Sequence, residues 1–192
     1  MASTRPYHHG ALKQALLNAA VELIADTGPR GFTLREVARR AGVSHNAPYR
    51  HFRDKNELLA AVATDGFDRL TGAMTRAATR SRPLERLRRS GLAYVDFALR
   101  WPQHFAAMFD APWDKLDYPE CAAAAQRCFG TLLGFVRECQ AAGQLPAGDS
   151  ERYAYQAWSL VHGIAKLATA GQLPWRSKAQ VLRFSARAMG GT

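Results

Sequence analysis

Apolar residues recur at helical spacing along nearly the whole chain, and almost no segment alternates apolar and polar residues with period two. One apolar stripe lies within residues 12–23, and Gly28 followed by Pro29 predicts the end of that helix. Because a three-to-four-residue spacing places side chains on one face of a helix, the pattern predicts an all-α fold of about nine helices without a sheet.

Capping signals predict where several of these helices begin. Thr33 and Glu36 form a T-x-x-E capping box at the start of a short helix, and Asp54 and Glu57 repeat that spacing before a long helix that ends near Thr79. Further along, we expect helices over 119–142, from Asp149 or Ser150 to about residue 170, and from Ser177 to about residue 190.

A chain of 192 residues is long enough for one domain or two small ones. Lys and Arg number 26 against 16 Asp and Glu, which gives a net charge of +10 and a pI near 10.1. Positive charge is densest before residue 56, and beyond Pro83 the chain becomes richer in alanine and aromatic residues. A nucleic-acid binder and a protein that is merely basic both fit this charge.

Cys121, Cys128 and Cys139 lie in one apolar helical stretch, and an odd number of cysteines cannot pair completely. With no apolar signal-peptide core near Met1 and no run long enough to span a membrane, we expect a cytoplasmic protein. Buried inert thiols are favoured over a redox sensor. The histidines lack a metal-ligand spacing, no enzyme motif stands out, and no cofactor is predicted.

Residues 33–55 predict a helix-turn-helix, with two short helices joined by Gly42, Val43 and Ser44. From the spacing alone, a tight helical hairpin of another kind also fits. The full stretch TLREVARRAGVSHNAPYRHFRDKNELL, however, resembles the DNA-binding domain of the tetracycline-repressor (TetR/AcrR) family of bacterial transcription regulators. With the first helix, the resemblance covers about residues 9–62.

This resemblance implies a DNA-binding domain over 1–55 and a ligand-binding and dimerisation domain over 56–192. It also implies a homodimer that pairs its last two helices, binds a double-stranded palindromic operator and is released by a small-molecule inducer. A narrower resemblance, carried by Trp158, His162 and Gly163, is to the subgroup whose C-terminal domain is named for a W-H-G motif.

Family positions map DNA contacts onto the helix-turn-helix. His45, Asn46 and Ala47 are expected on the exposed first turn of the recognition helix, where Asn suits adenine and an Ala methyl suits thymine. Tyr49 is expected to hold a phosphate, although a purely core ring stays open. The residues predicted to contact DNA are Thr33, Arg35, Ser44, His45, Asn46, Ala47, Tyr49, Arg50, His51 and Lys55.

Pro48 departs from the family pattern within this helix, where an apolar residue usually points into the angle of the helix-turn-helix. With Ser44 as the cap, the missing N–H of Pro48 forfeits about one intrahelical bond. Proline also disfavours helical geometry at the preceding residue, Ala47. We therefore expect Pro48 to constrain where the recognition helix begins.

Aromatic residues straddle Pro102 and Pro112, where a helical bundle would open into a cavity for a small hydrophobic or aromatic inducer. Trp158 and His162 are one helical turn apart and either face that cavity or pack structurally, with His162 bonded to a neighbouring helix or across the dimer interface. The residues predicted to bind ligand are Phe97, Trp101, Phe105, Met108, Phe109, Trp113, Trp158 and His162.

Overall fold

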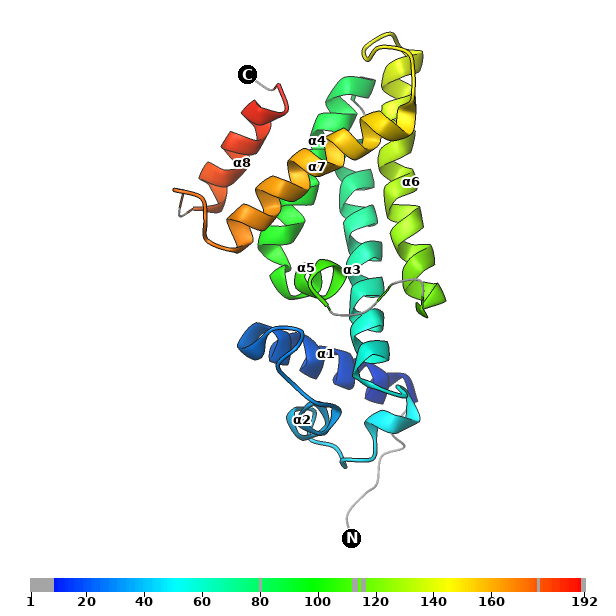
Figure 1. Cartoon of the computed structure of the whole chain (residues 1–192), viewed down its shortest axis with the longest axis vertical. Helices are drawn as coiled ribbons and strands as arrows, with labels where there is room; N and C mark the ends of the chain where they lie inside the picture. Colours follow the sequence, from blue (N-terminus) through cyan, green and yellow to red (C-terminus); the bar gives the residue numbers. More distant parts are fainter. Residues whose placement is uncertain (1–8, 80, 112–113, 115–116, 176, 191–192) are drawn as a thin grey trace. The chain divides into compact units, whose positions relative to one another are not determined.

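The computed structural model describes residues 9–79, 81–111, 114, 117–175 and 177–190. Over these residues it has eight α-helices, one 3-10 helix and no strand, which confirms the all-helical prediction. The elements are α1 (His9–Thr27), α2 (Leu34–Arg40), η1 (Pro48–Arg50), α3 (Lys55–Ala77), α4 (Pro83–Arg100), α5 (Pro102–Phe109), α6 (Pro119–Ala141), α7 (Ser150–Thr169) and α8 (Lys178–Ala188) (Figure 1). The ninth helix expected from the sequence is the 3-10 helix.

The helices begin largely where the capping signals place them. The hydroxyl of Thr33 accepts a hydrogen bond from the Glu36 amide, and the Glu36 carboxylate accepts one from the Thr33 amide. Ser177 and Gln180 form the same reciprocal box at α8. Asp149, rather than Ser150, caps α7. These contacts satisfy amides that the first turn of a helix leaves without partners.

The predicted capping box at the start of α3 is only half formed. Asp54 accepts a hydrogen bond from the Glu57 amide at 2.8 Å, but the Glu57 carboxylate accepts one from the Arg53 amide, at 2.6 Å. The spacing therefore correctly predicts Asp54 as the cap of α3. It wrongly predicts that the Glu57 carboxylate bonds the Asp54 amide, because the carboxylate bonds the amide of the preceding residue, Arg53, instead.

The chain forms two compact units, and α3 contributes its first half to one and its second half to the other. The N-terminal unit comprises residues up to 66 together with 103–121, and the C-terminal unit comprises 67–102 together with residues from 122 onward. The sequence predicts a different boundary, between a DNA-binding domain over 1–55 and a ligand-binding and dimerisation domain over 56–192. That division concerns function rather than packing, and it stays a prediction.

The N-terminal unit contains α1, α2, α5 and the first half of α3, with α1 packed against α2 and α5 against α3. Its core includes Leu16, Val37, Phe52 and Phe105, all at most 2% exposed. A Cβ added at Gly66 of α3 would lie 2.6 Å from the sulfur of Met108 on α5. The glycine therefore lets the two helices approach closely, which fixes α5 on α3 within this unit.

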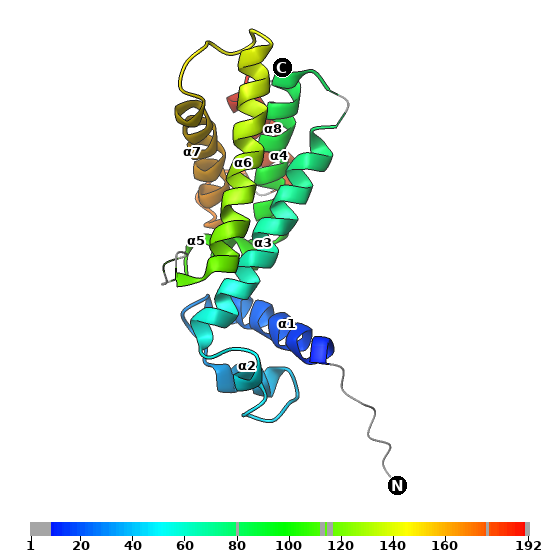
Figure 2. The same ribbon diagram turned by 90° about the vertical axis from the view of Figure 1, so that its right-hand side faces the viewer.

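The C-terminal unit is centred on α4, which packs against α7 and α8. On another side, the second half of α3 runs beside α6 in both views (Figure 1 and Figure 2), and Arg127 of α6 bonds Asp68 of α3 at 2.9 Å. A Cβ at Gly91 of α4 would lie 2.5 Å from the sulfur of Met189, just after α8. Close packing therefore holds α8 against α4.

Candidate nucleic-acid interface

The turn after α2 has the geometry that the helix-turn-helix requires. Gly42 adopts a φ of 68°, in the left-handed region that favours glycine, and the Val43 amide donates to the Ala38 carbonyl at 3.0 Å. Val37 and Ala38 are buried behind this turn. The chain is thus redirected sharply into the segment expected to contact DNA.

Residues 44–50, here called the 44–50 turn, do not form the expected α-helix. Their backbone bonds span three residues: the Ala47 amide donates to the Ser44 carbonyl at 2.9 Å, and the Arg50 amide to the Ala47 carbonyl at 3.2 Å. Pro48 has no N–H with which to donate to Ser44 at four-residue spacing. The chain therefore makes a turn and the 3-10 helix η1 where the sequence predicted a regular recognition helix.

Two expectations for Ala47 are wrong. Although it precedes a proline, its φ of −60° and ψ of −41° are right-handed helical, because the two backbone bonds at Ala47 outweigh the steric preference against this conformation. Ala47 as a whole is also only 8% exposed and lies beside the buried Pro48, whereas the sequence predicted an exposed position. In this structure Ala47 supports the turn from inside.

The other side chains of the 44–50 turn face outward. His45, Asn46 and Arg50 are exposed, as is Ser44, whose carbonyl is used in the turn. Tyr49 is 53% exposed, which excludes the interpretation of a purely core ring. A single tight turn therefore presents an amide, an imidazole, a phenol and a guanidinium to solvent, groups that bind base edges and phosphates.

The other residues predicted to contact DNA precede or follow this turn in the chain: the family resemblance implies phosphate contacts for Thr33, His51 and Lys55, and a guanine contact for Arg35. Thr33 and Arg35 are exposed at the start of α2, while His51 is half-buried. Lys55 is already engaged: its Nζ donates to the Arg30 carbonyl at 3.0 Å and lies 5.4 Å from the centre of the Phe32 ring. Contact of Lys55 with a phosphate therefore requires that the ammonium be shared or released.

Arg40, at the end of α2, is exposed and pairs with two carboxylates of α1. Its guanidinium lies 2.7 Å from the Asp26 carboxylate and 3.3 Å from that of Glu22. The bond to Asp26, followed by that to Glu22, raises the pKa of Arg40 above its ordinary value. These bonds fasten the end of α2 to α1 and so help to hold the helix-turn-helix together.

In the C-terminal unit, Trp158 and His162 meet a third residue that sequence analysis missed. The indole Nε1 of Trp158 donates to the hydroxyl of Tyr94 at 3.1 Å, and that hydroxyl lies 2.8 Å from Nδ1 of His162. Tyr94 is 5% exposed, and burial raises its pKa well above the ordinary value. Its partner positions lie 64 and 68 residues away, so no local motif identifies it.

This arrangement favours the structural interpretation of Trp158 and His162. A hydroxyl that accepts from the indole still has its own hydrogen to donate to His162 Nδ1, so all three polar groups are satisfied between α4 and α7. The Trp158 and His162 rings lie 5.8 Å apart at an interplanar angle of 66°. The pair anchors α7 on α4.

The remaining predicted ligand residues are divided between the two units. Phe97 is buried, and Trp101 is exposed with its ring centre 4.9 Å from the Arg69 guanidinium carbon. Phe105 and Met108 are buried in the N-terminal unit, where Phe109 packs 5.0 Å from Phe105. Trp113 lies outside the described residues.

The three cysteines are all buried, as predicted. Burial raises the pKa of Cys128 to about 11 and also raises that of Cys139, which disfavours the reactive thiolate.

Within the described ranges, no three His, Cys, Asp or Glu side chains are grouped so as to hold a metal ion. None of the helices described is long and apolar enough to cross a membrane.

Two family models match the chain over most of its length. Residues 16–62 match the model described as bacterial regulatory proteins, tetR family, and residues 87–189 match tetracyclin repressor-like, C-terminal domain. An N-terminal helix-turn-helix joined to such a helical domain defines a DNA-binding transcription regulator. The chain belongs to the tetR family of bacterial regulatory proteins. The W-H-G subgroup stays a prediction, because neither description names it.

Individual proteins agree with this assignment. The chain is 30% identical to the HTH-type transcriptional regulator BetI of Rhizobium meliloti (strain 1021) over 162 residues, covering 79% of this chain and 75% of BetI. It is 37% identical to a solved protein of unknown function from Rhodococcus sp. RHA1, with a TM-score of 0.82 over 97% of this chain and 98% of that one.

A more distant structure shares the fold. AibR, solved in complex with isovaleryl coenzyme A and operator DNA, is 19% identical, with a TM-score of 0.72 over 94% of this chain and 100% of AibR.

Proposed function

We propose that this protein is a homodimeric repressor that binds a palindromic operator through the 44–50 turn and is released from it by a small-molecule inducer. The observation that carries the proposal is the 44–50 turn itself, which holds His45, Asn46 and Tyr49 exposed on a capped and buried framework. A cytoplasmic location and a regulatory rather than enzymatic role belong to the same proposal.

The contact types follow from side-chain chemistry. Asn46 can form two hydrogen bonds to the major-groove edge of adenine, and His45 reaches a neighbouring base or phosphate. Tyr49, Arg50 and Thr33 hold the phosphate backbone on either side, which fixes the register but carries no sequence information directly. In this division Asn46 contributes most of the discrimination between operators.

An exposed apolar stripe on α7 supports pairing with a second copy. Leu160 and Leu167 are 41% and 48% exposed. Gly163 lies between them at helical spacing, and a Cβ added there would meet nothing within 4 Å in this chain. A partner helix can therefore approach closely at Gly163. We place the dimer interface on α7 and α8, as the family resemblance implies.

An inducer acts by binding one dimer geometry better than another. The 44–50 turns of the two protomers must lie about 34–36 Å apart to enter successive major grooves on one face of the DNA. A ligand that prefers a dimer with another spacing shifts the population away from the operator, whereas one that binds both forms equally has no effect. AibR, which shares this fold, was solved with isovaleryl coenzyme A and operator DNA bound. It supports the proposal that a protein of this fold binds both a small molecule and DNA.

The test is selection of bound sequences from a random DNA pool with the full chain, followed by footprinting of the selected site. We expect a palindromic consensus protected by a dimer, whose size sedimentation measures independently. Candidate compounds are then screened for release of the selected DNA. Uniform protection of any sequence, or stable binding by a monomer, would contradict the proposal.

A further inference from the structure

The net charge of the chain lies on one of its two compact units. The N-terminal unit has ten Lys and Arg against ten Asp and Glu, because the basic residues before residue 56 are offset by acids elsewhere in that unit. The C-terminal unit has 16 Lys and Arg against 6 Asp and Glu and therefore carries the whole charge of +10. Such a surplus of positive charge favours a polyanionic partner for this unit.

Arginines from three helices gather at one end of the C-terminal unit, where the end of α3, the start of α4 and the end of α6 meet in both views (Figure 1 and Figure 2). The Leu84 amide of α4 donates to the side chain of Gln144, just after α6, at 2.8 Å. We call this part of the unit the arginine-rich end. It has no lysine, and its described arginines are Arg76, Arg82, Arg86, Arg88, Arg89 and Arg137.

Three of these arginines are engaged within the chain. Arg86 pairs with Glu138 at 2.8 Å, and Arg89 pairs with Glu85 at the same distance. Arg88 donates to a backbone carbonyl at 3.1 Å. Since Glu85 and Glu138 are the only acids in residues 76–89 and 131–144, these pairs leave no local carboxylate for another arginine.

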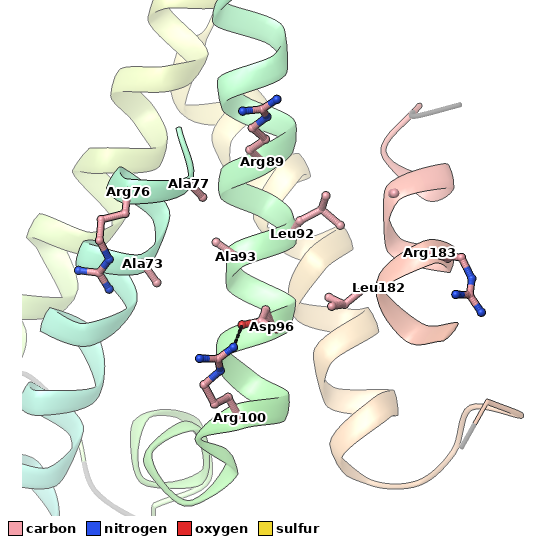
Figure 3. A pocket seen from close by; sticks show the side chains of 11 residues that line it. Ala73, Arg76, Ala77, Arg89, Leu92, Ala93, Asp96, Arg100, Leu182 and Arg183 are labelled. Carbon is pink, nitrogen blue, oxygen red and sulfur yellow. Dashed lines mark ion pairs between the residues drawn. The ribbon is translucent and has the colours of Figure 1, made fainter. Parts of the chain in front are cut away.

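The other three arginines are open to a partner. Arg76, Arg82 and Arg137 are exposed, and within the described part of the chain they form no ion pair. The guanidinium of Arg76 points away from α4 (Figure 3). None of the three is on α7 or α8, so the proposed dimer helices do not include them. An exposed guanidinium binds phosphate oxygens with paired hydrogen bonds.

We propose that the arginine-rich end binds the phosphate backbone of duplex DNA outside the operator, independently of sequence. Duplex DNA carries a negative charge about every 1.7 Å of its axis, so it can pair with several guanidiniums at once without a shaped pocket. This goes beyond the proposed function, which assigns the DNA contacts to the 44–50 turn.

The surroundings of these arginines favour DNA over a protein or a membrane. Protein hot spots and membrane-binding surfaces both use exposed large apolar side chains. Among the described residues, the exposed large apolar side chains all lie elsewhere, at Tyr49, Trp101, Tyr155, Leu160 and Leu167. Charge without an apolar anchor is typical of sequence-independent contact with phosphates.

The experiment is a fluorescence anisotropy titration of an unselected random pool of duplexes with the full chain, since such a pool reports backbone contact rather than base contact. We expect the combined variant Arg76→Gln, Arg82→Gln and Arg137→Gln to bind the pool at least fivefold more weakly at about 50 mM salt. The difference should disappear at about 300 mM salt, where phosphate contacts are screened.

A matched variant separates this surface from net charge. Arg69→Gln, Arg100→Gln and Arg127→Gln together remove the same charge from exposed positions of the C-terminal unit. These arginines already have partners, as Figure 3 shows for Arg100 and Asp96. This variant should bind the pool within about twofold of the original chain. Thermal unfolding checks that both combined variants keep the fold.

Failure of the operator proposal is distinguishable from failure of this one. Asn46→Ala changes an expected base contact and should leave binding to the random pool unchanged. If selection yields no palindromic operator but the arginine-rich end still contributes to pool binding, only the operator proposal is wrong.

Two results with the pool would overturn the inference. One is pool binding that the substitutions at the arginine-rich end leave unchanged, and the other is equal weakening by the matched variant. If the substitutions instead weaken binding only to phosphatidylglycerol vesicles, or only to polyglutamate, the surface binds a membrane or an acidic protein, and its assignment to DNA is wrong.

Discussion

The Trp158–Tyr94–His162 network and the 44–50 turn differ in where their polar groups find partners. In the network, indole, phenol and imidazole bond one another between two helices of the same chain. In the turn, the side chains of His45 and Asn46 are exposed. Family resemblance identified both segments, but their side chains differ in burial and in bonding within the chain. Bonding within the chain therefore favours a structural role for the network, and exposure supports the proposed role of the turn in DNA binding.

The largest expected effect is on the network. Tyr94→Phe removes the hydroxyl shared by Trp158 and His162, and we expect it to lower the free energy of unfolding by about 3 kcal/mol, because two partly buried groups lose a partner. Denaturant unfolding measures this. Tyr155→Phe, at an exposed tyrosine of α7, should change stability by less than about 0.5 kcal/mol. A neutral Tyr94→Phe would show that the network contributes no stability.

The converse effect is expected in the turn. Asn46→Ala should weaken operator binding by about 2 kcal/mol and relax the preference at one or two base pairs, while the unfolding free energy stays unchanged. Binding to a panel of single-base operator variants measures this. Asn18→Ala, at an exposed position of α1, is the matched control. An equal loss of affinity across every variant would assign Asn46 to the phosphate backbone instead.

Cys128 is a buried group whose protonation should make the stability of the fold depend on pH. Its pKa is raised by burial from 9.0 to about 11, so between these values the folded chain keeps a proton that the unfolded chain loses. This stability is fully present below pH 9 and is lost as pH rises toward 11, by about 1 kcal/mol in the first unit. Cys128→Ala should flatten this part of the pH profile. Identical profiles would show that Cys128 titrates normally.

The smallest effect is expected at Pro48. Pro48→Leu restores an amide that can donate to the Ser44 carbonyl, so we expect the 44–50 turn to become more α-helical and operator preference to change by about threefold to fivefold, roughly 1 kcal/mol. Dimerisation should be unaffected. Circular dichroism, sedimentation and the operator panel measure these three properties. Unchanged preference across the panel would show that Pro48 only fills space.

Local contacts were predictable from the sequence and distant ones were not. Thr33 bonds Glu36 and Ser177 bonds Gln180 across three residues, so a short pattern contains both partners. Tyr94 bonds residues more than 60 positions away, and no short pattern contains both partners of such a bond. The form of the 44–50 turn was mispredicted because the family pattern was applied over a proline that cannot supply the helical bond.

The bonds of Arg40 and Lys55 have a consequence for how binding responds to salt. DNA binding releases counterions, and each phosphate neutralised contributes about −0.9 to the slope of log K against log salt. Arg40 already has two carboxylate neighbours, and Lys55 donates to a carbonyl. Arg40 therefore displaces counterions from DNA only if it releases a carboxylate, and Lys55 only if it shares its ammonium with the phosphate or releases the carbonyl. The measured slope should be shallower than the count of basic residues before residue 56 suggests, leaving a larger share of operator affinity to direct base contacts.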